Sequence, residues 1–274
     1  MIYEIYRLSL VPKTQMSLFD EKAEPRRDVL NRIFGNKHSF SHYKREFVYV
    51  PNPQQFRNRD VLIGRVGKKL EGLAHRGPED YLTEYTESRW TAAELFINVT
   101  DSPKHGQVVA FERTADIGKP QAILSSFIRY LNERGEGRGY DLFLGATVPS
   151  SEFWSAMERH SKKDLTKLSF HLFAPNILKA GGTTKEMMEK FNNDEGAEDI
   201  RLDLNGSPGR LNAFTDTVRS LAEYALAGAG EIIAKAGKRV LFSSKDEART
   251  IEIDKKAAPA IIDRARAFAG QPEE

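Results

Sequence analysis

The segment from Trp90 to Pro149 constrains the fold most, because it carries the clearest periodicity in the chain. Residues 93–99 alternate between apolar and polar side chains and residues 107–111 are almost continuously apolar, so both predict strands. Between 120 and 133 the apolar positions repeat at helical spacing, and the glycine-rich end at 135–139 predicts where the helix stops. With the apolar strand expected at 141–146, the segment should fold as a β-β-α-β unit.

Weaker patterns on either side of this unit predict an α+β fold with a mixed sheet, ending in a C-terminal helix plus short β segments. Strands are expected at 2–10, 40–50, 61–66, 168–172, 200–204, 231–234, 239–242 and 250–253. Helices are expected at 25–34, 150–157, 184–191, 208–225 and 261–268. Residues 74–89, which contain Gly, Pro and many charges, are expected to form a long surface loop.

The clearest division of the chain lies near Pro149. It predicts an N-terminal α+β domain with basic strands at 1–149 and a C-terminal α+β domain at 150–274. The alternative, that both halves share one continuous sheet and form one domain, stays open at this point.

The composition excludes several classes of protein. The chain contains no cysteine, which rules out disulfides and thiolate metal sites and is typical of a reducing cytoplasm. No run of apolar residues approaches the length of a membrane span, so we expect a cytoplasmic protein that does not enter a membrane. The phosphate-binding P-loop, the dinucleotide fingerprint and the zinc-protease motif are missing, so no cofactor or metal is expected.

The net charge of +2 conceals a strong asymmetry along the chain. From Arg26 to Arg76 there are 12 Lys and Arg residues against 4 Asp and Glu, a local charge of +8 that the remainder offsets with −6. A local excess of this size attracts polyanions.

The basic residues in this segment alternate with aromatic ones, a composition that suits the binding of a phosphate backbone. Nine of them are the candidate nucleic-acid-binding residues: Lys37, Lys44, Arg45, Arg57, Arg59, Arg65, Lys68, Lys69 and Arg76. The interleaved rings are those of Phe40, Tyr43, Phe47, Tyr49 and Phe56. No helix-turn-helix, zinc-finger or RNA-recognition motif accompanies them, so binding without base-specific readout is expected.

Two other functions are compatible with the same sequence. His38 and His42 could serve as the acid and base of a metal-independent ribonuclease or nuclease, with neighbouring cations holding the phosphate. Alternatively, the chain could be an interaction subunit of a multi-protein complex. The heptad-like spacing from Leu211 to Ala225 would then provide its docking face or a dimer seam.

The order of elements resembles that of RexA-like phage-exclusion proteins and of small bacterial proteins found beside phage-defence genes. The resemblance spans about residues 40–175 and depends on the charged strands, the apolar strand pair from Leu95 to Phe111, the helix ending in glycines, and the segment from Ser150 to Trp154 before the strand at 168–173. It implies a bacterial, cytosolic homodimer or higher oligomer that binds double-stranded DNA largely without sequence preference in anti-phage defence. The basic strands from Lys44 to Arg76 would then face the DNA.

Overall fold

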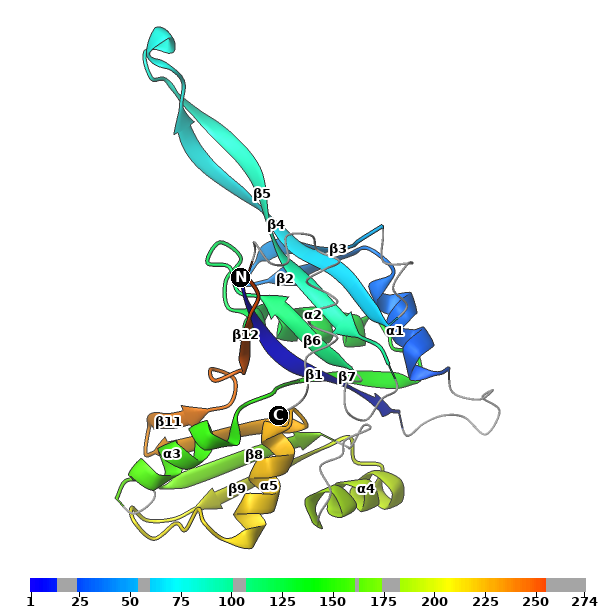
Figure 1. Ribbon diagram of the computed structural model, residues 1–274, viewed down its shortest axis with the longest axis vertical. Coiled ribbons are helices and arrows are strands. Elements are labelled where there is room, and N and C mark those ends of the chain that lie inside the picture. The colour runs from blue at the N-terminus through cyan, green and yellow to red at the C-terminus, as the bar shows by residue number, and fades with distance from the viewer. Residues whose placement is uncertain (14–23, 54–59, 101–106, 161–162, 174–182, 255–274) are drawn as a thin grey trace.

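The computed structural model describes residues 1–13, 24–53, 60–100, 107–160, 163–173 and 183–254, which form two antiparallel sheets with helices packed on them (Figure 1). The strands of the first sheet are β1 (Ile2–Pro12), β2 (His38–His42), β3 (Arg45–Pro51), β4 (Val61–His75), β5 (Glu84–Asn98), β6 (Val108–Glu112), β7 (Tyr140–Ala146) and β12 (Thr250–Glu252). They run in the order β12-β1-β6-β5-β4-β3-β2, and β7 pairs with the second half of β1. The α+β class is therefore confirmed, whereas the expected mixed sheet is wrong, because all strand pairs in the described part of the chain are antiparallel.

The second sheet is smaller, and helices pack on it as well. Its strands are β8 (Lys167–Phe173), β9 (Asp199–Asn205), β10 (Gly230–Ala236) and β11 (Arg239–Ser243), in the order β11-β10-β8-β9. The helices are α1 (Arg26–Phe34), α2 (Pro120–Glu133), α3 (Ser150–His160), α4 (Thr183–Glu195) and α5 (Asp216–Leu226). In this part of the chain α5 packs on β8 and β10, and α4 packs on α5.

The β-β-α-β unit is present as β5, β6, α2 and β7, and its helix organises the core. The buried stripe of α2 includes Phe127, whose ring centroid lies 4.8 Å from that of Phe40 and 5.4 Å from that of Tyr49. Burying one such aromatic side chain contributes about 1.5–3 kcal/mol, beyond which stacked pairs add roughly 0.5–1.5 kcal/mol. This aromatic layer fixes α2 against β2 and β3.

A missing side chain on β4 makes room for one of these rings. A Cβ atom at Gly64 would lie 2.3 Å from Cε2 of Tyr49, so any larger residue would displace the ring. The Tyr49 hydroxyl donates a 2.8 Å hydrogen bond to the carbonyl of Phe34 at the end of α1. Gly64 therefore allows β3, β4 and α1 to pack on one another.

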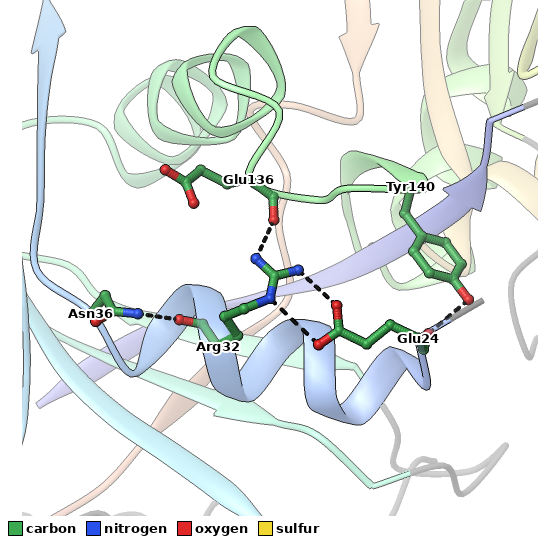
Figure 2. Close-up of polar contacts among 5 residues, drawn as sticks. All are labelled: Glu24, Arg32, Asn36, Glu136 and Tyr140. Carbon is green, nitrogen blue, oxygen red and sulfur yellow. Dashed lines mark hydrogen bonds and ion pairs between the residues drawn. The ribbon is translucent and has the colours of Figure 1, made fainter. Parts of the chain in front are cut away.

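A half-buried arginine ties α1 to the loop between α2 and β7 (Figure 2). Arg32 donates one hydrogen bond of 2.9 Å to Oε2 of Glu24 and another of 2.8 Å to the carbonyl of Glu136. The Tyr140 hydroxyl donates a 3.1 Å hydrogen bond to the backbone carbonyl of Glu24. The planar guanidinium suits such convergent acceptors, so Glu24, which precedes α1, is tied to the last turn of the helix.

The two sheets meet over one large hydrophobic core, which is separate from a smaller buried cluster around Tyr3 and Phe96. The described chain crosses between the sheets at two places. Residues of β1 to β7 and of β8 to β11 contribute to one continuous buried cluster. A Cβ atom at Gly145 would lie 2.3 Å from the carbonyl oxygen of Gly228, whose φ of +88° is itself in the region that favours glycine. The expected boundary at 149/150 falls where the chain leaves the first sheet, but β12 returns to that sheet and pairs with β1.

Several expected elements differ from those observed. The single strand expected at 40–50 is two strands, β2 and β3, joined by a tight turn. The loop expected at 74–89 is wrong, because β4 continues to His75 and β5 begins at Glu84, which leaves only a short connection that includes the 3-10 turn Pro78–Asp80. The helix expected at 208–225 begins at Asp216, capped by the Thr215 hydroxyl. The last helix, expected at 261–268, lies outside the described residues.

The outer part of the β4–β5 hairpin escaped prediction for a physical reason. Alternation of apolar and polar residues marks a strand only where one face is buried. From Glu84 to Trp90 every side chain of β5 is exposed on both faces of the ribbon. Figure 1 shows this hairpin projecting away from the rest of the molecule.

We expect a pH-dependent contribution to stability from His171 on β8. Its Nε2 lies 3.1 Å from Asp199 Oδ2 on β9, and its Nδ1 lies 3.8 Å from Glu231 Oε2 on β10. The Glu231 carboxylate, with help from Asp199 and against partial burial, raises the pKa of His171 above its usual 6.5. A raised pKa stabilises the fold below pH ~6.5, and this contribution is lost as pH rises through the folded-state value.

The change His171→Asn should therefore destabilise the protein at mildly acidic pH and have less effect at alkaline pH. Chemical denaturation of both proteins between about pH 5.5 and 8.5, the range in which histidine titrates, measures the difference. His75→Asn is the matched control, because its 3.6 Å contact with Glu84 is exposed and should contribute little. A difference for His171→Asn that does not vary with pH would contradict the assignment.

Candidate nucleic-acid interface

The turn between β2 and β3 brings a tyrosine and a lysine out of the sheet. Tyr43 and Lys44 occupy the two turn positions with φ of 46° and 64°, as a two-residue hairpin with positive φ at both positions requires. His42 and Arg45 form the last pair of the hairpin. Glycine or asparagine normally occupies these positions, so the residues Tyr43 and Lys44 did not predict a turn here. The Tyr43 side chain is 85% exposed.

Cationic side chains from three elements converge beside this turn. His42 Nδ1 lies 2.9 Å from the Ser126 hydroxyl on α2, and Arg129 donates to the same hydroxyl at 3.4 Å. The third element is β4, whose Lys68 lies 5.6 Å from the centroid of the Phe47 ring. We call this group the basic corner, and its members are His42, Tyr43, Lys44, Arg45, Lys68 and Arg129.

The electrostatics of the basic corner reflect the repulsion between its members. Partial burial, then the charges of Arg129 and Lys68, lower the pKa of His42. Burial and the charge of Arg45 also lower the pKa of Lys68, although Asp116 opposes this shift. Arg129 and Lys68 therefore disfavour the charged form of His42, and Arg45 disfavours that of Lys68, as expected in a region of positive potential.

Lys68 has a different place in the basic corner from the one expected. Its side chain is buried, with 8% exposed, and Nζ donates to the carbonyl of Ile117 at 3.2 Å. Because its ammonium group is held within the protein, Lys68 contributes to the positive potential of the basic corner. Direct contact with a polyanion would be made by its exposed neighbours. Those neighbours are Lys44, Arg45 and Arg129.

The other basic residues expected at the interface lie elsewhere. Lys37 is exposed at the opposite end of β2. Three others form ion pairs with acidic residues on the β4–β5 hairpin: Arg65 with Glu94 at 3.2 Å, Lys69 with Glu71 at 3.2 Å, and Arg76 with Asp80 at 4.0 Å. Arg57 and Arg59 lie outside the described residues. The basic segment of the sequence is therefore divided in space.

The two histidines do not form an acid–base pair. They are four residues apart on β2, which separates their Cα atoms by roughly 13 Å. His38 is buried beside Phe127 and Tyr130, and its Nε2 lies 2.7 Å from the carbonyl of Ile33. Acid–base cleavage needs both groups within hydrogen-bond reach of one phosphate, which this arrangement does not offer.

Arg129 and Ser126 were missed because they come from a distant part of the chain. Both lie on α2, where the sequence pattern predicts an apolar stripe but no functional site. Their position beside His42 follows from the packing of Phe127 against β2, which a local pattern cannot reveal.

The expected docking face at Leu211 to Ala225 is partly wrong, because α5 buries Val218, Leu221 and Ala225 within its own chain.

Two features of the described residues bear on the class of function. In the described ranges, no three His, Asp or Glu side chains gather as the ligands of a metal ion would. Likewise, no helix in the described part of the chain is both long and apolar enough to cross a membrane.

The change Arg129→Gln should raise the pKa of His42. The removed positive charge disfavours the imidazolium, so its loss brings the pKa nearer to its ordinary value of 6.5. Titration of the histidine ring protons by NMR measures this directly. Arg134→Gln, near the end of the same helix, is the control and should leave His42 unchanged. An unaltered His42 pKa in Arg129→Gln would show that the two groups do not interact.

Comparison with known proteins does not assign the chain to a family. No protein-family model matches the chain, and no curated protein matches it by sequence. The resemblance to RexA-like proteins consequently depends on the order of elements and stays a prediction.

Proposed function

We propose that the protein binds double-stranded DNA through the basic corner, largely without regard to base sequence and without cleaving it. The observation that carries this proposal is the convergence of His42, Arg45, Lys68 and Arg129, in which Arg129 and Lys68 disfavour the charged form of His42 and Arg45 disfavours that of Lys68. A polyanion relieves that repulsion, because its phosphates neutralise several cations at once.

The exposed members of the basic corner have the chemistry that phosphate contact needs. Lys44, Arg45 and Arg129 reach solvent, and Glu46, the nearest acidic residue in β3, points to the opposite face of the strand from Arg45. Tyr43 adds an exposed ring that packs on the imidazole of His42, with centroids 4.4 Å apart. Such a ring can pack against a sugar or a splayed base.

The lack of sequence preference follows from the kind of contact proposed. Phosphate contacts fix position and supply affinity, but they carry no direct information about bases. The binding of duplex DNA and the role in anti-phage defence are implied by the resemblance to RexA-like proteins and form part of the same proposal.

Affinity for a short DNA duplex should fall steeply with salt, and removal of the corner's exposed cations should flatten that dependence. Each phosphate contact contributes a slope of about −0.9 in a log–log plot of binding constant against salt concentration. The combined variant Lys44→Gln, Arg45→Gln, Arg129→Gln should therefore lose up to three such increments. Fluorescence anisotropy at several salt concentrations measures both slopes.

The matched control removes three charges from the second half of the chain, with Lys190→Gln, Lys238→Gln and Arg239→Gln. This control should bind DNA nearly as tightly as the unchanged protein, because the proposal attributes binding to the basic corner and not to the net charge of the protein. Equal losses in both variants, or no DNA binding at low salt, would refute the proposal.

Parallel incubations with labelled RNA and DNA in EDTA distinguish binding from cleavage. Both nucleic acids should stay intact. Cleavage that disappears in His42→Ala would instead support the nuclease alternative.

A further inference from the structure

His42 is the member of the basic corner that ordinarily titrates near neutral pH. A histidine side chain changes its charge between about pH 5 and 8, whereas exposed lysine and arginine side chains stay protonated there. The ring of His42 is partly exposed at the end of β2, beside the turn residues Tyr43 and Lys44. Its protonation state therefore decides whether the corner presents one more positive charge to a phosphate.

The contact with α2 holds the His42 ring in either protonation state. Nδ1 lies 2.9 Å from the hydroxyl oxygen of Ser126, whose side chain is buried. A hydroxyl group can donate to a neutral ring nitrogen or accept from a protonated one. The ring can therefore gain a proton without turning, and Nε2 is the nitrogen that a phosphate oxygen would approach.

The charged groups around His42 come from several elements of the first sheet. Arg129 lies on α2, Lys68 lies on β4, and Arg45 on β3 pairs with His42 in the hairpin register. In the described part of the chain, the charges that act on His42 are those of Arg129 and Lys68. The carboxylate of Asp116, in the connection before α2, acts instead on Lys68.

In the free protein these surroundings favour the neutral ring. Partial burial is the larger cause, and the charges of Arg129 and Lys68 add to it, so the pKa of His42 lies below its ordinary value of 6.5. At pH 7 and above the imidazole is therefore mostly uncharged. The corner then presents less positive charge than its composition suggests.

A phosphate group in the basic corner reverses this preference. An opposite charge within about 4–6 Å favours the charged form of a group and changes its pKa by roughly 1–3. The same anion also offsets the cations that oppose protonation of the ring. The imidazolium that forms can donate from Nε2 to a phosphate oxygen in a charge-assisted hydrogen bond.

We propose that His42 is the proton-dependent contact of the basic corner, neutral in the free protein and protonated from solvent when a DNA phosphate enters the corner. DNA binding is then stronger at mildly acidic pH than at alkaline pH. The inference rests on the proposed binding of DNA by this corner and adds regulation by pH. Ser126 is a positioning residue, because it holds the ring without contacting the DNA.

The direction of the effect follows from linkage between proton binding and DNA binding. A group whose pKa is higher in the complex strengthens binding below its free-state value, and the gain is lost as pH rises through the value in the complex. The affinity should therefore change across about pH 5.5 to 8. An increase of 1 in the pKa corresponds to a tenfold increase in affinity, so we expect about a tenfold difference across this range.

Fluorescence anisotropy with a short labelled DNA duplex measures this difference. The ionic strength is kept constant and the buffers contain no phosphate, because salt and free anions would themselves change the affinity. Isothermal titration calorimetry near pH 7, in two buffers with different ionisation enthalpies, should show that binding takes up protons. Both measurements use the unchanged protein.

The change His42→Asn isolates the contribution of the ring. Asparagine places an amide near the position of Nδ1, where it can bond to Ser126, but it does not titrate. The variant should lose most of the gain in affinity at acidic pH. His75→Asn is the matched control and should keep the full pH dependence, because His75 is exposed on the β4–β5 hairpin, outside the basic corner.

NMR titration of the His42 ring protons, with and without the duplex, tests the same point without a variant. The pKa of His42 should be higher in the complex by about 1 or more. A value that does not rise on binding would contradict the inference.

The remaining outcomes separate this inference from the proposed function. DNA binding of equal affinity at every pH would overturn the role of His42 and leave the proposed function intact. A pH dependence that persists in His42→Asn would assign the effect to another group and would also overturn it. A protein that binds no DNA at low salt at any pH would refute the proposed function itself.

Discussion

The packing of Phe127 against the rings of Phe40 and Tyr49 is the contact on which the rest of the first sheet depends. It fixes the rotation of α2 over β2 and β3, and thereby the direction of the residues on either side of the stripe. Ser126 and Arg129 lie beside His42 for this reason alone. The basic corner is thus a consequence of how the apolar core is filled.

The extent to which the sequence predicted the fold follows from how burial shapes local patterns. Elements with one buried face, such as β8, α2 and most of α5, carry the expected period. The outer part of the β4–β5 hairpin could not be recognised, because a ribbon with both faces in solvent has no reason to alternate apolar and polar residues. The β2–β3 turn escaped because two residues with side chains, Tyr43 and Lys44, adopt positive φ. Charge composition pointed to Lys44 and Arg45, but only tertiary packing brings Arg129 to them.

The basic excess near the N-terminus resolves into two populations with different physical roles. On the hairpin, Arg65, Lys69 and Arg76 have carboxylates within 4.0 Å, so much of their charge is locally compensated. In the basic corner, cations lie beside other cations, whose charges help to lower the pKa of His42 and of Lys68. A count of charges along the sequence cannot separate these cases, although the two groups of cations have different electrostatic surroundings.

The return of β12 to the first sheet has a consequence for the order in which the chain folds. β1 pairs along one edge with β6, and along the other with β7 and β12, the last of which lies at the far end of the described chain. During synthesis the first strand would emerge long before its final neighbour, and contacts so distant in sequence close slowly. The first sheet thus begins to form before the second sheet and is completed after it.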